Sequence, residues 1–167
     1  MGDSEMAEGS VWEAMGNASH HGLRNLVGIL DMNRLGQRGP TMLEWDGDTY
    51  ARRAEAFGWQ AIQVDGHDVD EIDAAYGRVA EADRPVLIVA KTIKGYGVSF
   101  LADRDGWHGK ALSEDEEVTA VEELGGERRG EPSNRVARSR SALRLAALPG
   151  MVVLQPLRPE DGESHDS

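Results

Sequence analysis

The chain has 167 residues, and 40% of them are hydrophobic, which is enough to fill the core of one ordinary domain. It contains no cysteine, which excludes disulfides, zinc thiolates and cysteine nucleophiles, and its formal net charge of −12 argues against nucleic-acid binding as a principal function. Because no apolar stretch approaches the roughly 18 residues of a membrane span, we expect a soluble cytoplasmic protein without membrane contact.

The first part of the chain predicts a helix followed by a buried strand. Small and apolar residues recur at helical spacing over residues 9–23, and Gly22 stands where this helix should stop. Residues 26–30 form a continuous apolar run that ends at Asp31, which is typical of a strand covered on both faces. A loop is then expected to continue to Pro40.

Two more strands and two more helices follow in alternation. Asp48 can cap a helix over residues 49–57, residues 61–64 predict a second strand, and residues 68–82 predict a further helix. Residues 86–90 predict a third strand after a proline. Strands and helices that alternate at this spacing predict an α/β fold with a mostly parallel sheet and helices on both faces.

Polar residues follow each predicted strand. Residues 31–33, 65–67 and 91–94 fall at the carboxyl ends, where ligands collect in such sheets. Asp3 and Asn33 bring a carboxylate and an amide oxygen that can meet at one hard cation, such as Mg²⁺, which keeps coordination sites for phosphates. This pattern indicates a candidate diphosphate site. Alternatively, Asp3 is a helix cap and Asn33 is a turn residue.

The composition changes after Gly125, which suggests one folded domain over residues 1–125. Residues 126–167 offer too little apolar surface to offset the entropy of ordering, so we expect a linker or a disordered tail. Six arginines lie in this second segment between Arg128 and Arg144, and an RNA-binding tail is the alternative interpretation.

Six sequence blocks occur in order from Gly2 to about Leu112. They are Glu8-Gly9-Ser10-Val11-Trp12-Glu13-Ala14, Asn25-Leu26-Val27, Asn33-Arg34-Leu35-Gly36-Gln37, Val64-Asp65-Gly66-His67, Ala90-Lys91-Thr92-Ile93-Lys94-Gly95 and Trp107-His108-Gly109-Lys110. Together they make the chain resemble transketolase, in its thiamine-diphosphate-binding domain. The resemblance implies the fold of that domain without its N-terminal strands, because Met1 stands where a strand should end.

The same resemblance implies a set of site residues. Asp3, Asn33 and the backbone carbonyl of Leu35 match the ligands of a Mg²⁺ or Ca²⁺ ion. The implied contacts of thiamine diphosphate are Asp3, Ser4, Glu8, Asn33, Gln37, Lys94 and His108, with His108 as the catalytic candidate. Ser4 replaces a family glycine, adds a side chain and restricts φ, so the affinity for the cofactor is expected to differ.

Two of these residues have alternative interpretations. Glu8 matches a glutamate at the subunit contact between two cofactor sites, yet a solvated glutamate at a helix start fits the same pattern. His108 and Lys110 match residues near the diphosphate, but they also suit a surface loop that Trp107 anchors.

The resemblance implies a transferase of the pentose phosphate pathway that moves a two-carbon ketol unit from a ketose phosphate to an aldose phosphate. The family's activating glutamate lies in a separate pyrimidine-binding domain, which has no match here. We therefore expect a fragment that is inactive without missing segments or a complementary chain, in a homodimer or a heteromer. The alternatives are an enzyme of the dihydroxyacetone synthase or deoxyxylulose-phosphate synthase type, and a non-catalytic binding or dimerisation fragment.

Overall fold

A computed structural model describes residues 1–126 of the chain. Its elements, in order, are the 3-10 helix η1 (Asp3–Ala7), α1 (Gly9–His20), β1 (Val27–Met32), β2 (Leu35–Gly36), β3 (Gly39–Pro40), α2 (Gly47–Ala56), β4 (Gln60–Asp65), α3 (Val69–Ala80), β5 (Val86–Lys91) and α4 (Glu114–Glu123). The linker or tail expected over residues 126–167 lies outside the described residues except for Gly126. Within the described part, no helix is long and apolar enough to cross a membrane.

The core of the fold is a parallel sheet of three strands in the order β1-β5-β4. Residues 86–90 of the central strand β5 are buried, as expected for an apolar run that is covered on both faces. Ile88 aligns with Ile29 of β1 on one side and with Ile62 of β4 on the other. All three strands that the sequence predicts are therefore present, and their parallel arrangement is confirmed.

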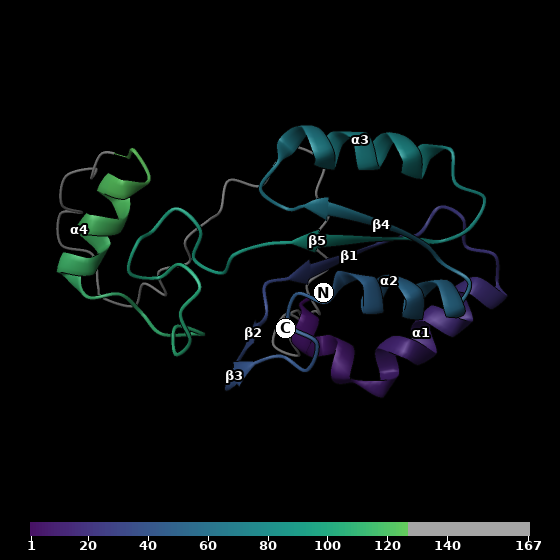
Figure 1. Cartoon of the computed structure of the whole chain (residues 1–167), viewed down its shortest axis with the longest axis horizontal. Coiled ribbons are helices and arrows are strands. Elements are labelled where there is room, and N and C mark those ends of the chain that lie inside the picture. The colour runs from purple at the N-terminus through teal and green to yellow at the C-terminus, as the bar shows by residue number, and fades with distance from the viewer. Residues whose placement is uncertain (127–167) are drawn as a thin grey trace, which may run out of the picture. The chain divides into compact units, whose positions relative to one another are not determined.

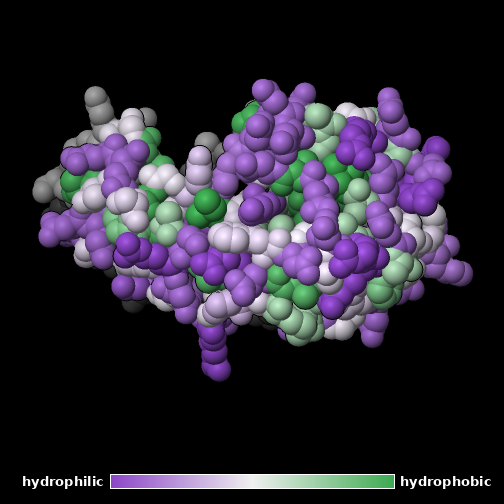
Figure 2. Space-filling model, in the orientation of Figure 1, coloured by the Kyte–Doolittle hydropathy of each residue, from purple (hydrophilic) through white to green (hydrophobic). Residues whose placement is uncertain are grey.

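Helices cover both faces of this sheet, with α1 and α2 on one face and α3 on the other (Figure 1). The first face buries one apolar cluster, which consists of Met6, Met15, Ala18, Leu30, Met32, Tyr50, Ala54, Trp59, Leu87 and Val89. The second face buries another, which consists of Ile62, Val64, Ala75, Val86, Ile88 and Ala90. The outer surface of α3 is mostly hydrophilic, and hydrophobic side chains are visible below it (Figure 2). The predicted α/β arrangement is confirmed.

The helix boundaries follow recognisable caps, with one correction to the prediction. Gly22 adopts a φ of +60° just beyond α1, which is the left-handed conformation that ends many helices. Asp68, expected to be the first residue of the helix, is the N-cap of α3 and accepts hydrogen bonds from two backbone N–H groups. The cap of α2 is Asp46 rather than Asp48, because the side chain of Asp46 accepts the N–H of Thr49. Asp48 instead lies in the first turn of α2.

The first two residues pair with the outer edge of β1. The terminal amino group of Met1 donates to the carbonyl of Ile29 at 2.9 Å, and the N–H of Asp31 donates to the carbonyl of Met1 at 2.9 Å. Gly2 and Asp31 form a parallel bridge. Asp3 is thereby held beside the carboxyl end of β1.

Two features differ from the loops that the sequence suggested. The stretch expected to be a loop up to Pro40 contains the short antiparallel pair β2 and β3. The helix α4 was not predicted, although Ser113 and Glu116 form a capping box at its start. Neither feature changes the arrangement of the sheet.

Candidate functional site

The site lies beyond the carboxyl ends of the three parallel strands. Residues 31–33, 65–67 and 91–94 include the last residues of β1, β4 and β5 and the residues just after them, so they lie at this edge, as the sequence predicts. The helix η1 and the β2–β3 pair also contact this region, since η1 packs against β1 and β2. Segments that are far apart in the sequence therefore contribute side chains to one place.

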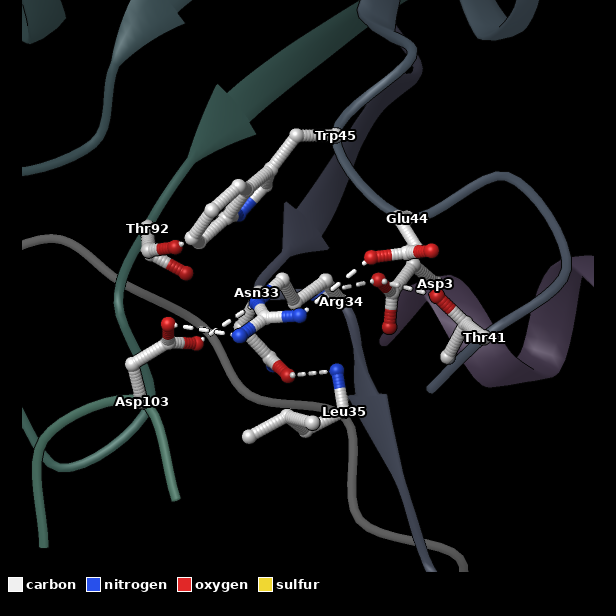
Figure 3. Close-up of polar contacts among 9 residues, drawn as sticks. All are labelled: Asp3, Asn33, Arg34, Leu35, Thr41, Glu44, Trp45, Thr92 and Asp103. Atoms are coloured by element: carbon white, nitrogen blue, oxygen red, sulfur yellow. Dashed lines mark hydrogen bonds and ion pairs between the residues drawn. The ribbon is translucent and has the colours of Figure 1, made fainter. Parts of the chain in front are cut away.

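Asp3 is a buried carboxylate at the centre of this site. Only 3% of the residue is exposed, and its Oδ2 atom accepts the N–H of Arg34 at 2.7 Å and the hydroxyl of Thr41 at 2.9 Å (Figure 3). Burial raises the pKa of Asp3 above its ordinary value and the charge of Asp31 adds to this, while the two hydrogen bonds act in the opposite direction. Asp3 thus carries a negative charge that its surroundings only partly compensate.

The ion pairs found among residues 1–126 involve other carboxylates than that of Asp3. The same part of the chain holds no cluster of three or more His, Cys, Asp or Glu side chains that could bind a metal ion. A cation next to Asp3 would therefore depend on mixed oxygen donors, such as amide and carbonyl oxygens. Hard cations such as Mg²⁺ and Ca²⁺ accept such a ligand set.

Asn33 is held in one orientation by both ends of its amide group. Its Oδ1 atom accepts the N–H of Leu35 at 3.1 Å, and its Nδ2 atom donates to Asp31 Oδ2 at 3.0 Å. Thr92 donates its hydroxyl to the other oxygen of Asp31, which fixes that carboxylate in turn. The amide group of Asn33 therefore stabilises the turn after β1, and its oxygen keeps a second lone pair for a further partner.

The carbonyl of Leu35 lies next to two of the predicted cofactor residues. Lys94 donates from Nζ to this carbonyl at 3.2 Å, and the same Nζ atom lies 3.0 Å from His108 Nδ1. The structure therefore brings together Leu35, Lys94 and His108, which are widely separated in the sequence. An ammonium group beside the turn at Asn33 supplies a positive charge that suits a phosphate.

The other predicted residues are exposed around this centre. Gln37 lies in the turn between β2 and β3, and Glu8 stands at the N-cap of α1, where its side chain accepts no hydrogen bond from the helix. Ser4 lies beside Gly36, since a Cβ atom at Gly36 would be 3.4 Å from the Cβ of Ser4. The ammonium group of Lys110 makes a cation–π contact with Trp107, with Nζ 3.8 Å from the ring centroid.

The backbone conformation of Ser4 bears on how this residue can differ from a glycine. Within the described residues, the non-glycine residues with positive φ are Arg34, Glu44 and Asp103. Ser4 therefore has no need of the conformational freedom of glycine in this fold. The side chain itself, rather than the restriction of φ, is what distinguishes this chain at a position where the family has glycine.

An open cavity of about 190 Å³ adjoins Asp3 and Ser4. Arg38 and Arg53 line it and supply positive charge, and Thr41 is a further polar residue in its wall. A diphosphate group needs cationic and hydrogen-bonding partners of this kind. The cavity therefore places two positively charged side chains near Asp3 and Ser4.

The sequence did not single out Thr41, Arg34 or Asp103 as site residues. Arg34 had one signal, since it directly follows Asn33 in a block that carries the family resemblance. Asp103 had none, because it contacts Arg34 across a separation of 69 residues. Thr41 likewise reaches Asp3 only through the folded chain.

A parallel sheet with helices on both faces, and with polar groups and a cavity beyond the carboxyl ends of its strands, is the architecture of a cofactor-binding α/β domain. Residues 1–133 match the family described as "Transketolase, thiamine diphosphate binding domain". The chain therefore belongs to the transketolase family, and the resemblance seen in its sequence blocks is confirmed.

Individual relatives agree with this assignment. The chain is 48% identical over 124 residues to human transketolase, a match that covers 74% of this chain and 20% of the relative. It is 50% identical over 113 residues to transketolase-like protein 2 of Bos taurus, covering 67% of this chain and 18% of the relative. The chain thus spans about a fifth of the length of the curated relatives it matches.

Solved structures support the fold. Transketolase from Campylobacter jejuni is similar with a TM-score of 0.69 and 32% identity, over 75% of this chain and 20% of that chain. A transketolase from Pichia stipitis, solved in complex with sedoheptulose 7-phosphate, has a TM-score of 0.67 and 28% identity, over 75% of this chain and 19% of that chain.

Proposed function

We propose that this chain provides the cation- and diphosphate-binding part of a transketolase-type enzyme. The enzyme would transfer a two-carbon ketol unit from a ketose phosphate to an aldose phosphate. The observation that carries the proposal is the buried carboxylate of Asp3, which accepts the N–H of Arg34, the residue between Asn33 and Leu35, in a chain of this family. We propose Asp3, Asn33 and the carbonyl of Leu35 as ligands of Mg²⁺ or Ca²⁺.

The surroundings of Asp3 fit a divalent cation. Burial raises the pKa of Asp3 because its ionised form has lost contact with water. A neighbouring cation would stabilise this ionised form in place of water. The amide oxygen of Asn33 and the Leu35 carbonyl offer neutral oxygen ligands beside it. These three groups leave further positions for phosphate oxygens and water on an octahedral cation.

The remaining residues suit the phosphates of thiamine diphosphate. Lys94 and His108 form a pair next to the Leu35 carbonyl, and Ser4 and Gln37 lie at the same edge of the sheet. Lys94 can neutralise a phosphate oxygen, and His108 can donate to one or move a proton there. Thiamine diphosphate supplies, when bound, the carbon nucleophile that carries the ketol unit.

Catalysis would also need parts that these residues do not provide. We assign no general base. Glu8 is proposed as a contact to a neighbouring subunit, because its side chain is exposed on this chain. A pyrimidine-binding domain, in a homodimer or on a complementary chain, would complete the site.

Cofactor binding is the direct test. Titration calorimetry of the full chain with thiamine diphosphate and Mg²⁺, alone and with a separately produced transketolase pyrimidine-binding domain, should give saturable binding that chelation abolishes. Asp3→Ala and Asn33→Ala should each weaken it at least about tenfold. Asp48→Ala is the matched control, since this exposed aspartate lies in α2 rather than among the proposed ligands.

Two results would contradict the proposal. The absence of saturable binding, even with the complementary domain present, would favour a non-catalytic binding or dimerisation fragment. Unchanged affinity in Asp3→Ala and Asn33→Ala would show that the cofactor binds elsewhere. If binding occurs, a comparison of ketose phosphates as donors in the completed assembly would separate transketolase activity from the dihydroxyacetone synthase and deoxyxylulose-phosphate synthase types.

A further inference from the structure

The side chain of Arg34 contacts two separate segments around the candidate site. Its guanidinium group donates to both carboxylate oxygens of Asp103, from Nε and from Nη2, each at 2.6 Å. Its Nη1 atom lies 3.3 Å from Glu44 Oε2, and its Cζ atom lies 4.7 Å from the ring centroid of Trp45. Figure 3 shows the guanidinium between the two carboxylates and beside the indole.

The same residue contacts the proposed cation ligand through its backbone. The N–H of Arg34 donates to Asp3 Oδ2, and Arg34 itself stands between Asn33 and Leu35. Any rotation of this peptide would turn the N–H away from Asp3. The side-chain contacts of Arg34 therefore help to fix the backbone of the cation-site turn.

Asp103 connects Arg34 to the loop that carries Lys94. The N–H of Asp103 donates to the carbonyl of Lys94 at 2.9 Å, which closes the loop between these two residues. Lys94 in turn reaches the Leu35 carbonyl. The Arg34–Asp103 pair and the Lys94–Leu35 contact thus join the same two segments at two points.

Backbone conformation sets these residues apart from the rest of the described chain. Arg34, Glu44 and Asp103 have φ values of +63°, +46° and +57°, and they are the non-glycine residues with positive φ within residues 1–126. Such conformations are unfavourable for residues with a Cβ, and they persist where surrounding contacts impose them. That all three belong to one ion-paired group indicates that their contacts hold three strained turns in place.

We propose that Arg34, Glu44 and Asp103 form a clasp that positions Lys94 and the Asp3–Asn33 turn for the magnesium diphosphate group. This inference rests on the proposed function. It assigns Arg34 as a positioning residue, because the guanidinium of Arg34 is paired with the carboxylates of Asp103 and Glu44, and only the backbone of Arg34 contacts Asp3. Trp45 supports the clasp from a second side, since its Nε1 atom donates to the Thr92 carbonyl at 3.1 Å.

The clasp predicts how affinity changes when either partner loses its charge. Arg34→Gln and Asp103→Asn should each weaken the binding of Mg²⁺ with thiamine diphosphate about tenfold in the full chain completed by the complementary domain. Asparagine tolerates positive φ, so Asp103→Asn removes the charge without adding backbone strain. Arg34→Lys should restore only part of the affinity, because an ammonium group cannot pair with both carboxylate oxygens at once.

A double variant separates a clasp from two independent contributions. Arg34→Gln combined with Asp103→Asn should be little worse than either single variant if the two residues act through each other. The control is Arg84→Gln, since the exposed Arg84 pairs with Asp83 at 2.8 Å before β5 begins, and this change should leave affinity unaltered. Full affinity in both single variants, or strictly additive losses in the double variant, would overturn the proposal.

Amide exchange in the ligand-free chain tests the clasp even if the cofactor does not bind. Arg34→Gln should speed exchange at the Asp103 amide about tenfold, while the Ile72 amide in α3, which donates to Asp68, stays unchanged. Unchanged exchange at Asp103 would overturn the clasp. A failure of the wild-type chain to bind the cofactor would overturn the proposed function instead, so the two failures are distinguishable.

Discussion

The backbone N–H of Ile93 donates to Nε2 of His67 at 2.8 Å, which links the turn after β4 to the loop after β5. The imidazole ring of His67 also stacks on Tyr96, with ring centroids 3.7 Å apart. Ile93 directly precedes Lys94, so this hydrogen bond bears on the position of the proposed phosphate-binding lysine. The contact spans 26 residues of the chain, so it follows from the folded arrangement and not from a local sequence pattern.

Two substitutions at His67 separate its hydrogen bond from its ring packing. His67→Phe keeps an aromatic ring beside Tyr96 but removes the acceptor of the Ile93 N–H, so it should cost about 1 kcal/mol of stability and speed exchange at that amide. His67→Gln keeps an acceptor and should retain more of the protection. Urea denaturation and amide exchange measure the two effects, and equal protection of Ile93 in both variants would contradict the assignment.

Asp3→Asn should stabilise the metal-free chain at neutral pH while weakening the binding of the cation. The raised pKa of Asp3 means that the folded chain favours its protonated form. The stabilisation that goes with this proton is fully present below the ordinary value of 3.8 and is lost as the pH rises through the higher value in the fold. At pH 7 the buried charge therefore destabilises the chain, and asparagine removes that charge while still accepting hydrogen bonds from Arg34 and Thr41.

Thermal denaturation at pH 7 with and without Mg²⁺ checks this prediction. Mg²⁺ should raise the denaturation midpoint of the wild-type chain. Asp3→Asn should have a higher midpoint without Mg²⁺, and its apparent affinity for Mg²⁺, derived from the rise in midpoint, should be at least about tenfold lower. The exposed Asp48→Asn serves as the control for loss of one negative charge. A lower midpoint for Asp3→Asn would show that the hydrogen bonds to Asp3 outweigh the cost of burying its charge.

The sheet could be predicted from the sequence because its strands are short apolar runs that end at polar residues. Residues 86–90 show this most clearly, since a short apolar run rich in β-branched residues after a proline is typical of a strand buried on both faces. The helix α4 escaped prediction because four acidic residues fill its first turn and leave only a weak apolar pattern. Its capping box, Ser113 with Glu116, was the local signal that could have identified it.

Only those residues of the candidate site that belong to a local sequence pattern could be predicted. Asn33 and Lys94 stand in two of the six sequence blocks, just after strands, and the fold brings Asp3 to the same edge of the sheet. The contacts of Arg34 with Asp103 and of Asp3 with Thr41 join residues that no spacing rule relates. Such pairs follow from the packing of loops around the sheet, which a linear pattern does not contain.

Ser4→Gly should tighten the binding of thiamine diphosphate with Mg²⁺ by a modest factor, about threefold. Serine does not strain the backbone here, so the change acts by removing an exposed side chain beside the cavity and Gly36. Because glycine loses more conformational entropy on folding, the same variant should lower stability by roughly 0.5–1 kcal/mol. Titration calorimetry and urea denaturation measure the two effects, and unchanged affinity would show that the side chain at this position does not meet the cofactor.

The two aspartates that Arg34 contacts should titrate on opposite sides of the ordinary aspartate value. The hydrogen-bonded guanidinium of Arg34 lowers the pKa of Asp103, whereas burial raises the pKa of Asp3. The stabilisation that Asp103 contributes is therefore present above pH 3.8 and is lost as the pH falls through the lower pKa of Asp103 in the fold.

Carboxyl carbon shifts followed by NMR should show Asp103 ionising first as the pH is raised and Asp3 last. Arg34→Gln should return Asp103 toward 3.8, and it should leave Asp3 raised because burial is the main cause there. An unshifted Asp103 in the wild-type chain would mean that its pair with Arg34 does not persist in solution, and the clasp would lose its basis.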